Sequence, residues 1–223
     1  ADKDNVEHFA WQTSWGVSWR LIGAMIMVHG DDKGLVLPPK VAPMQVVIVP
    51  IYRNEEAKNI VLSKVEEIQN ELETKDIRIH VDDREGLSPG YKFNDWELKG
   101  VPLRIEIGPK DIENQKIVVA KRYNLEKISL GFNEIEKIST ILDEIQVEML
   151  KKAKGQAEDN NLNISDYSDF KSKIERGGFF NSPWCGKLEC EEKIKEETGA
   201  EIRVVPFSSE NNSKECIYCK EQS

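Results

Sequence analysis

Four cysteines near the end of the 223-residue chain have a spacing that suits a metal ion. Four residues separate Cys185 from Cys190, two separate Cys216 from Cys219, and 25 lie between the two pairs. Such short loops let paired thiolates converge on one tetrahedral zinc ion at about 2.3 Å. Because four thiolates leave no open coordination position, the pattern predicts a structural and not a catalytic site. Two disulfides or four unrelated thiols are the alternatives, but residues 1–5 are charged where a secretory signal would be apolar.

A second group of residues suited to ligand binding lies in the stretch TSWGVSWR at residues 13–20. Gly16 lets a flat ligand approach the backbone, Trp15 offers a stacking surface, and Arg20 supplies a fixed charge with planar donors. On an extended backbone one face would be polar and would consist of alternate residues, namely Ser14, Gly16, Ser18 and Arg20. The alternative is an aromatic strand that packs on a helix, with Arg20 at its edge.

A third group, in GYKFNDWELKGVPLR at residues 90–104, suits the recognition of unpaired bases. Tyr91, Phe93 and Trp96 offer surfaces on which bases could stack. Glu97 and Arg104 offer acceptors and donors for base edges, which proteins read mainly in single-stranded RNA. The alternative is an amphipathic helix whose core side includes Phe93 and Trp96, three residues apart.

The first two elements of the chain are predicted from its N-terminal pattern. The loose alternation of residues 9–20 predicts a strand, and the helical spacing of the apolar residues up to Val28 predicts a buried helix. A connector rich in Gly, Pro and Asp follows at residues 29–43. His29, at the predicted helix end, is interpreted as capping backbone carbonyls and not as an acid or base.

An α/β framework is predicted for the middle of the chain. Strands are predicted at residues 44–52, 77–81, 103–107 and 117–120, and a helix-compatible segment covers residues 90–100. One apolar helical stripe consists of Ala57, Val61, Val65, Ile68 and Leu72. A second long stripe consists of Ile135, Ile138, Leu142, Ile145 and Met149. Strands separated by helices predict a mainly parallel or mixed sheet that is covered on both faces.

Two polar connectors divide the chain into three predicted domains. The first boundary falls near Ala42, and the second falls in the polar run KKAKGQAEDNN at residues 151–161. The predicted domains are residues 1–42, residues 43–152 and residues 153–223. The last of these carries all four cysteines.

Composition indicates a soluble globular protein without a general affinity for nucleic acid. Apolar residues make up 39% of the chain and charged residues 32%, and no apolar run reaches the roughly 20 residues that span a bilayer. The net charge of −9 argues against a nonspecific coat on nucleic acid, which needs clustered cations. Residues 88–127, however, hold eight basic and six acidic residues, so this window is where we expect a polyanion to bind.

Three blocks of the sequence together resemble one family. Residues 12–51, from QTSWGVSWRLIG to VVIVPI, closely resemble motif 3 of class II aminoacyl-tRNA synthetases, specifically prolyl-tRNA synthetases of the archaeal and eukaryotic type. Residues 88–111 resemble the anticodon-binding domain of that family, and the four cysteines resemble its C-terminal zinc domain. The resemblance implies a remnant of the antiparallel-sheet catalytic domain, then an α/β anticodon-binding domain with a mixed sheet, then a small α+β zinc-binding domain.

The resemblance also implies an activity and the residues that serve it. The intact enzyme would ligate L-proline to tRNA(Pro) through prolyl-adenylate, with Mg²⁺ on the ATP, as a cytoplasmic homodimer. The positions matching the ATP and prolyl-adenylate pocket are Ser14, Trp15, Gly16, Ser18 and Arg20. The positions matching the anticodon contacts are Phe93, Glu97, Arg104 and Lys110. The zinc ligands would be Cys185, Cys190, Cys216 and Cys219.

The chain departs from the family pattern in two respects. Trp19 stands where the family usually has a small polar residue. Motifs 1 and 2, which carry the proline contacts and the second ATP arginine, are expected before Ala1. We therefore expect a fragment that does not aminoacylate tRNA by itself, and no catalytic residue is assigned in it. The alternative is a nonenzymatic accessory module, derived from a synthetase, that binds tRNA or protein.

Overall fold

The computed structural model describes residues 1–9, 12–206 and 215–222. The chain divides into two compact units, Ala1–Leu150 and Lys151–Ser223. Within the described residues, no helix is long and apolar enough to cross a membrane. The two expected boundaries, after residues 42 and 152, stay predictions.

The N-terminal segment lacks the strand that its alternation predicted. Residues 12–18 have no regular structure, and the expected positions 10–11 lie outside the described residues. Helix α1 (Arg20–His29) forms where a helix was expected, but none of its residues is buried, so the prediction of a buried helix was wrong. The physical reason is that a strand needs a neighbour for its backbone hydrogen bonds and an apolar helix face needs a packing partner. Leu21 and Met27, at 59% and 82% exposure, have none within the described chain.

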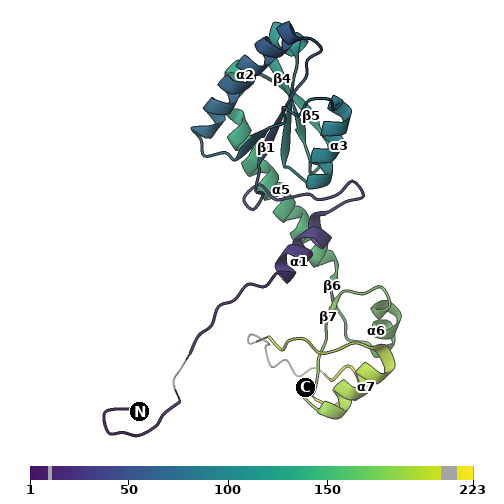
Figure 1. The fold of residues 1–223 in the computed structure, drawn as a ribbon. Helices are drawn as coiled ribbons and strands as arrows, with labels where there is room; N and C mark the ends of the chain where they lie inside the picture. The colour runs from purple at the N-terminus through teal and green to yellow at the C-terminus, as the bar shows by residue number, and fades with distance from the viewer. Residues whose placement is uncertain (10–11, 207–214, 223) are drawn as a thin grey trace. The chain divides into compact units, whose positions relative to one another are not determined.

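A five-stranded mixed sheet forms the centre of the first unit (Figure 1). Its strands are β1 (Val46–Pro50), β2 (Ile79–Val81), β3 (Leu103–Ile107), β4 (Lys116–Lys121) and β5 (Lys127–Gly131). Their order is β2-β1-β3-β4-β5, with β1 parallel to both β2 and β3, and β4 antiparallel to both β3 and β5. The predicted mixed sheet is thus confirmed. Every residue of β1 and β3 is buried, which explains the continuous apolar run in β1.

Helices cover both faces of this sheet, as predicted. The helices are α2 (Glu55–Glu73), α3 (Pro89–Lys99), α4 (Pro109–Glu113) and α5 (Lys137–Asp159), with a short 3₁₀ turn at Phe132–Glu134. Val46 and Ile48 of β1 pack in one core with the apolar stripes of α2 and α5. The alternate residues Val47 and Val49 pack with Trp96 of α3 on the other side, and Figure 1 shows α2 and α3 on opposite sides of the sheet. Trp96, at 5% exposure, is therefore a core residue, as the alternative interpretation of this helix predicted.

The segment before β1 is fastened to the end of α3. The backbone N–H groups of Leu35 and Leu37 donate to the carbonyls of Leu98 and Gly100, at 3.0 and 3.2 Å. These bonds satisfy carbonyls that the helix end leaves without intrahelical partners. Gly100 ends α3 with a φ of 72°, and a Cβ at this position would lie 2.5 Å from the carbonyl oxygen of Leu35. Only glycine fits this conformation and this close approach.

Replacing Gly100 with alanine is therefore expected to lower the free energy of unfolding of the first unit by about 1–3 kcal/mol, because left-handed backbone strain is added to the clash with Leu35. Urea unfolding followed by circular dichroism would measure it. The matched control is Gly90→Ala, where a Cβ would meet no heavy atom within 4 Å. The control should leave stability unchanged or slightly raised, since alanine favours the helix. Equal losses in the two variants would contradict the prediction.

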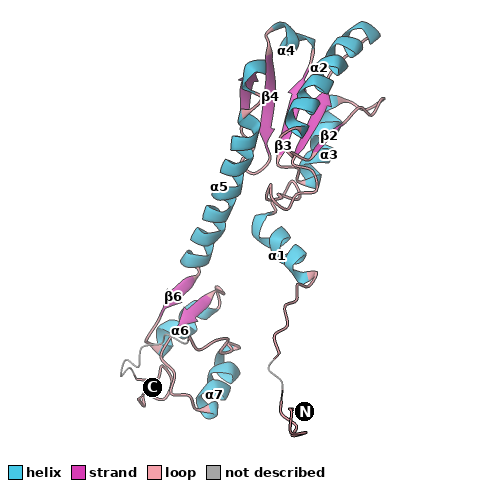
Figure 2. Ribbon diagram, turned by 90° about the vertical axis from the view of Figure 1, so that its left-hand side faces the viewer, coloured by secondary structure: helices cyan, strands magenta, loops and turns pink. Residues whose placement is uncertain are grey.

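The second unit is small and has a thin core. It contains strands β6 (Asn161–Asn163) and β7 (Phe179–Asn181), which pair in parallel, and helices α6 (Tyr167–Ile174) and α7 (Leu188–Thr198), as Figure 2 shows. Its buried apolar core in the described residues consists of Ile164, Phe170, Ile194 and Ile217. A core of this size supplies little stability, so a further cross-link is expected to support the unit.

Candidate functional site

Three of the predicted base-reading residues meet at one place in the first unit. Phe93 and Glu97 lie four residues apart on α3 and therefore on one side of that helix, facing Arg104 of β3. Nη1 of Arg104 donates to the Glu97 carboxylate and to the Phe93 carbonyl, each at 3.3 Å. The guanidinium carbon also lies 4.3 Å from the centroid of the Phe93 ring, within the range of a cation–π interaction.

Glu106 and Lys127 belong to the same cluster, although the sequence interpretation assigned neither to the base-reading group. Nε and Nη2 of Arg104 donate to one carboxylate oxygen of Glu106, at 3.1 and 2.9 Å. Nζ of Lys127 lies 2.8 Å from the same oxygen and 5.5 Å from the centroid of the Phe93 ring. Glu97 and Glu106 together hold the guanidinium of Arg104, a residue only 7% exposed, in one orientation. The signal for Glu106 was the two-residue spacing from Arg104, which puts both on one face of β3.

A pocket of about 210 Å³ opens beside this cluster. Its apolar wall consists of Trp96, Val101, Ala120 and Leu125, and its polar wall consists of Lys33, Glu97, Arg104, Lys121, Arg122 and Lys127. The volume lies below the roughly 300–1,000 Å³ of pockets for drug-sized ligands, so it suits one planar group such as a base. The polar wall has five cations and one carboxylate, which favours an anionic polymer at its rim.

Lys110 is not part of this cluster. It is exposed on α4, which begins after the carboxyl end of β3, whereas Arg104 is the second residue of that strand. The positions that the family resemblance grouped together are therefore three neighbours and one separate surface lysine. An exposed lysine outside the cluster, with its long flexible side chain, suits a contact to a backbone phosphate and not to a base edge.

The residues that match motif 3 do not form a pocket in the described chain. All five, namely Ser14, Trp15, Gly16, Ser18 and Arg20, are exposed. Trp15 is 93% exposed, and a Cβ on Gly16 would meet no heavy atom within 4 Å. Trp19, which stands where the family usually has a small polar residue, is 86% exposed and lies in the turn before α1. A nucleotide site here needs groups beyond these residues.

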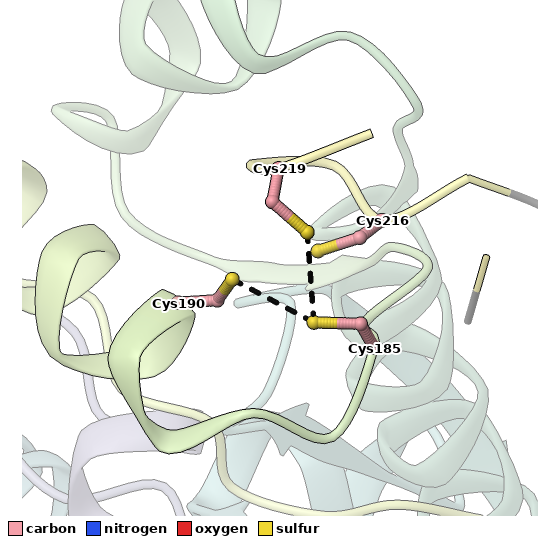
Figure 3. Close-up of side chains that lie close together, drawn as sticks. All are labelled: Cys185, Cys190, Cys216 and Cys219. Carbon is pink, nitrogen blue, oxygen red and sulfur yellow. Dashed lines mark hydrogen bonds between the residues drawn. The ribbon is translucent and has the colours of Figure 1, made fainter. Parts of the chain in front are cut away.

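The four cysteines of the second unit converge on one point (Figure 3). Their sulfur atoms all lie within 4.8 Å of one another, with Cys185 3.6 Å from Cys190 and 3.7 Å from Cys219. Four sulfurs at about 2.3 Å from one tetrahedral ion would lie roughly 3.8 Å apart, so the arrangement fits zinc. These separations are well beyond the roughly 2.05 Å of a disulfide bond. The geometry therefore favours a metal over two disulfides.

The surroundings of the cysteines differ in their effect on ionisation. Burial raises the pKa of the Cys190 thiol to about 12. Burial acts in the same direction on Cys216, but backbone N–H groups of Cys219, Tyr218 and Cys185 outweigh it and lower the pKa of that thiol to about 7. Backbone donors directed at a sulfur are the contacts that a metal-bound thiolate needs, because the thiolate keeps negative charge.

Comparison with known proteins finds matches for both units of the chain. The model described as "Anticodon binding domain" matches residues 45–140, and the model described as "Prolyl-tRNA synthetase, C-terminal" matches residues 167–223. The proline–tRNA ligase of Cenarchaeum symbiosum is 54% identical over 220 residues, which cover 98% of this chain and 46% of that protein. The ligase of Acetoanaerobium sticklandii is 51% identical over 209 residues, which cover 93% of this chain and 43% of that protein. Proline–tRNA ligase 2 of Clostridioides difficile is 46% identical over 225 residues, which cover all of this chain and 46% of that protein.

The chain thus spans about half the length of the curated relatives it matches. The matches extend over nearly the whole chain and include the block around Arg104 and the four cysteines. They confirm the resemblance of the chain to the C-terminal portion of prolyl-tRNA synthetases. The chain belongs to the prolyl-tRNA synthetase family and corresponds to the C-terminal portion of its members.

Proposed function

We propose that this chain is the tRNA-reading portion of a proline–tRNA ligase. The intact protein would activate L-proline with ATP and transfer it to tRNA(Pro). The observation that carries the proposal is the cluster of Phe93, Glu97 and Arg104, which lies inside the segment matched to anticodon-binding domains. Relatives at 46–54% identity are named as ligases, which favours an enzyme over a nonenzymatic accessory module.

The cluster has the groups needed to recognise a guanine of the UGG anticodon. A guanine presents donors on its Watson–Crick edge and acceptors at O6 and N7. The Glu97 carboxylate is an acceptor for the former, and the Arg104 guanidinium is a donor to the latter. The face of Phe93 can stack on a neighbouring base. Since Glu106 already fixes Arg104, little conformational entropy would be lost on binding.

The cations at the rim would hold the RNA backbone. Lys127 is 51% exposed even though it pairs with Glu106, and Lys110 is exposed on α4. Both can reach phosphates, which position a nucleic acid without reading its sequence. We therefore assign Lys110 and Lys127 to phosphate contacts, and base discrimination to Glu97 and Arg104.

The N-terminal segment would supply part of the ATP site. Arg20 would neutralise phosphate charge as the proline carboxylate attacks the α-phosphate, and Ser18 would contact the nucleotide, with Mg²⁺ on the ATP. Ser14, Trp15 and Gly16 would line the floor of the prolyl-adenylate pocket. The exposed apolar residues of α1 support this assignment, because such a helix needs a partner to pack against. A homodimer in the cytoplasm, as the family resemblance implies, completes the proposal for the intact enzyme.

A Zn²⁺ ion held by Cys185, Cys190, Cys216 and Cys219 is part of the same proposal. The ion would connect the loop before α7, the first turn of α7 and the C-terminal residues of the second unit. Its role would be structural, because all four positions would be filled by protein thiolates.

Binding of this chain to a tRNA(Pro) anticodon stem-loop tests the proposal. We expect preferential binding of the UGG stem-loop over one in which a guanine is replaced. Arg104→Ala should lose about 1–3 kcal/mol of that discrimination, because it removes the donors that read the base edge. Arg104→Lys keeps the charge and should lose most of the same discrimination, since lysine lacks the planar pair of donors.

Lys99→Ala is the matched control for this experiment. Lys99 also lies on α3 and is 47% exposed, but it pairs with Asp95 and not with the Arg104 cluster. Its loss should weaken binding of the two stem-loops equally or not at all. Equal weakening by Arg104→Ala and Arg104→Lys for both stem-loops would count against the assignment of Arg104 to base reading.

A further inference from the structure

Arg122 connects the anticodon-reading helix to the segment that precedes the sheet. It directly follows β4, and only 3% of it is exposed. Its Nε donates to the backbone carbonyl of Glu97 at 2.9 Å, and its Nη1 and Nη2 donate to the two carboxylate oxygens of Asp31 at 2.7 and 2.5 Å. One guanidinium thus holds the Glu97 carbonyl, 25 residues away in sequence, and the Asp31 carboxylate, 91 residues away.

The bond to Glu97 fixes the last turn of α3. Carbonyls in that turn lack intrahelical partners, and a cation at a helix C-terminus is favoured by the helix dipole. The Glu97 carbonyl accepts from both Arg122 and the N–H of Gly100. Glu97 is also the residue whose carboxylate accepts a hydrogen bond from Arg104. The orientation of the Glu97 carboxylate therefore depends on how Arg122 holds its backbone.

Asp31 is itself held in place by a rigid turn. Asp31 and Gly34 exchange two backbone hydrogen bonds, at 3.1 and 3.0 Å. A Cβ on Gly34 would lie 2.6 Å from the carbonyl oxygen of Leu98, so the turn lies directly against the end of α3. Lys33 of this turn lines the pocket and lies 3.9 Å from the Glu97 carboxylate. The turn is therefore part of the pocket, although it precedes the domain boundary that the sequence analysis predicted near Ala42.

Asp31 supplies the negative charge that the buried guanidinium requires. A buried charge is costly unless it is paired and hydrogen-bonded. Among the described residues, Asp31 is the carboxylate that forms an ion pair with Arg122. The hydrogen bond from Arg122 lowers the pKa of Asp31 to about 2, so the carboxylate is ionised throughout the physiological pH range.

We propose that Asp31 is a positioning residue for anticodon discrimination, which acts through Arg122 on Glu97 without contacting RNA. This inference rests on the proposed function of the Glu97 and Arg104 cluster. In Asp31→Asn the side chain keeps its size but loses its charge, so Arg122 is no longer held in the bidentate pair. The last turn of α3 then loses a fixed cap, and the Glu97 carboxylate samples orientations that do not fit the base.

The test measures binding of the whole chain to labelled anticodon stem-loops by fluorescence anisotropy. One stem-loop has the UGG anticodon, and in the other a guanine is replaced. For Asp31→Asn we expect the ratio of the two affinities to fall about tenfold, mainly through weaker binding of the UGG stem-loop. Asp31→Glu keeps the charge and should retain most of the discrimination. Asp32→Asn is the matched control, because Asp32 is the exposed neighbour and pairs with no cation in the described chain.

Each outcome has a definite meaning. If Asp31→Asn lowers both affinities in proportion, Asp31 has only a structural role and the inference is overturned. An unchanged ratio, or an equal fall in Asp32→Asn, overturns it as well. If Asp31→Asn does not fold, the ratio of the two affinities is measured in Asp31→Glu and in Arg122→Lys instead. Full discrimination by both of these variants would refute the inference. A wild-type chain that binds the two stem-loops equally would instead refute the proposed function itself.

Discussion

A chain in which Cys216 is replaced by serine is expected to lose its bound metal and to unfold in its C-terminal unit, while the α/β unit stays folded. The expected loss is large, because structural zinc sites in small domains contribute about 10–16 kcal/mol at neutral pH. The apolar core of that unit has four buried residues in the described chain, which cannot replace such a contribution. Within the described part of the chain, the core of the α/β unit includes no residue beyond Met149, so this core does not depend on the cysteines.

Elemental analysis by mass spectrometry would count the metal, with one zinc per wild-type chain as the expected result. Limited proteolysis should then cut Cys216→Ser only after residue 150, and a chelator should produce the same pattern in the wild type. Glu189→Gln is the matched control. Glu189 is exposed on α7 and directly precedes Cys190 in sequence. It should keep the metal. A metal-free chain with an intact second unit would refute the structural role of zinc.

The helices that cover the main core could be predicted because their signal is local. The buried residues of α2 are Val61, Val65, Ile68 and Leu72, all of which belong to the stripe found in the sequence. In α5, four members of the predicted stripe are buried within the helix, namely Ile138, Leu142, Ile145 and Met149. A period of 3.6 residues needs only neighbours in sequence, so it can be recognised before the tertiary structure is known.

Three strands, β5, β6 and β7, were not predicted from the sequence. Strand β5 has a mixed burial pattern, and β6 and β7 have three residues each. Such segments become strands because a partner with matching register is available, which depends on the rest of the fold. At residues 12–18 a strand was predicted that does not form, and the cause is the same. The aromatic and polar residues alternate there, but no strand in the described chain pairs with this segment.

The candidate site could be recognised in part, because its residues are joined by non-local contacts. Phe93 and Glu97 share a helix face, which spacing reveals. The contribution of Arg122 depends on contacts to residues 25 and 91 positions away, and no spacing rule predicts them. The convergence of the four cysteines could be predicted from their spacing, because paired ligands in short loops leave a local pattern.

A second large effect is expected at Asp82, the residue that fastens α3 to the sheet. Its carboxylate is fully buried and accepts from Arg84, at 2.8 and 2.7 Å, and from Nε1 of Trp96, at 2.7 Å. Nζ of Lys92, a residue only 4% exposed, donates to the Asp82 carbonyl and lies 3.7 Å from the carboxylate. Asp82→Asn would leave the buried Lys92 without its counter-charge, while Arg84 would keep its ion pair with Asp95. The change should cost about 3–5 kcal/mol of unfolding free energy.

Chemical denaturation of the whole chain at neutral pH would measure this loss. Asp83→Asn is the matched control, because Asp83 is the exposed neighbour and pairs with no cation among the described residues. The control should change the unfolding free energy by less than about 0.5 kcal/mol. Since Trp96 and Lys92 belong to α3, the Asp82 variant should also weaken anticodon binding. A similar stability for the two variants would show that Asp82 does not anchor the helix.

The dependence on pH gives an independent check of the same contacts. Burial alone would raise the pKa of Asp82, but hydrogen bonds from Arg84 and Trp96 and the charge of Lys92 together lower it below its ordinary value. In the unfolded chain the group titrates near pH 3.9, so the folded chain binds this proton only at lower pH. The stabilisation by Asp82 is therefore complete above about pH 5 and is lost as the pH falls below about 4. The stability difference between wild type and Asp82→Asn should shrink in that acidic range, and a difference that stays constant down to pH 2 would contradict the ion-pair account.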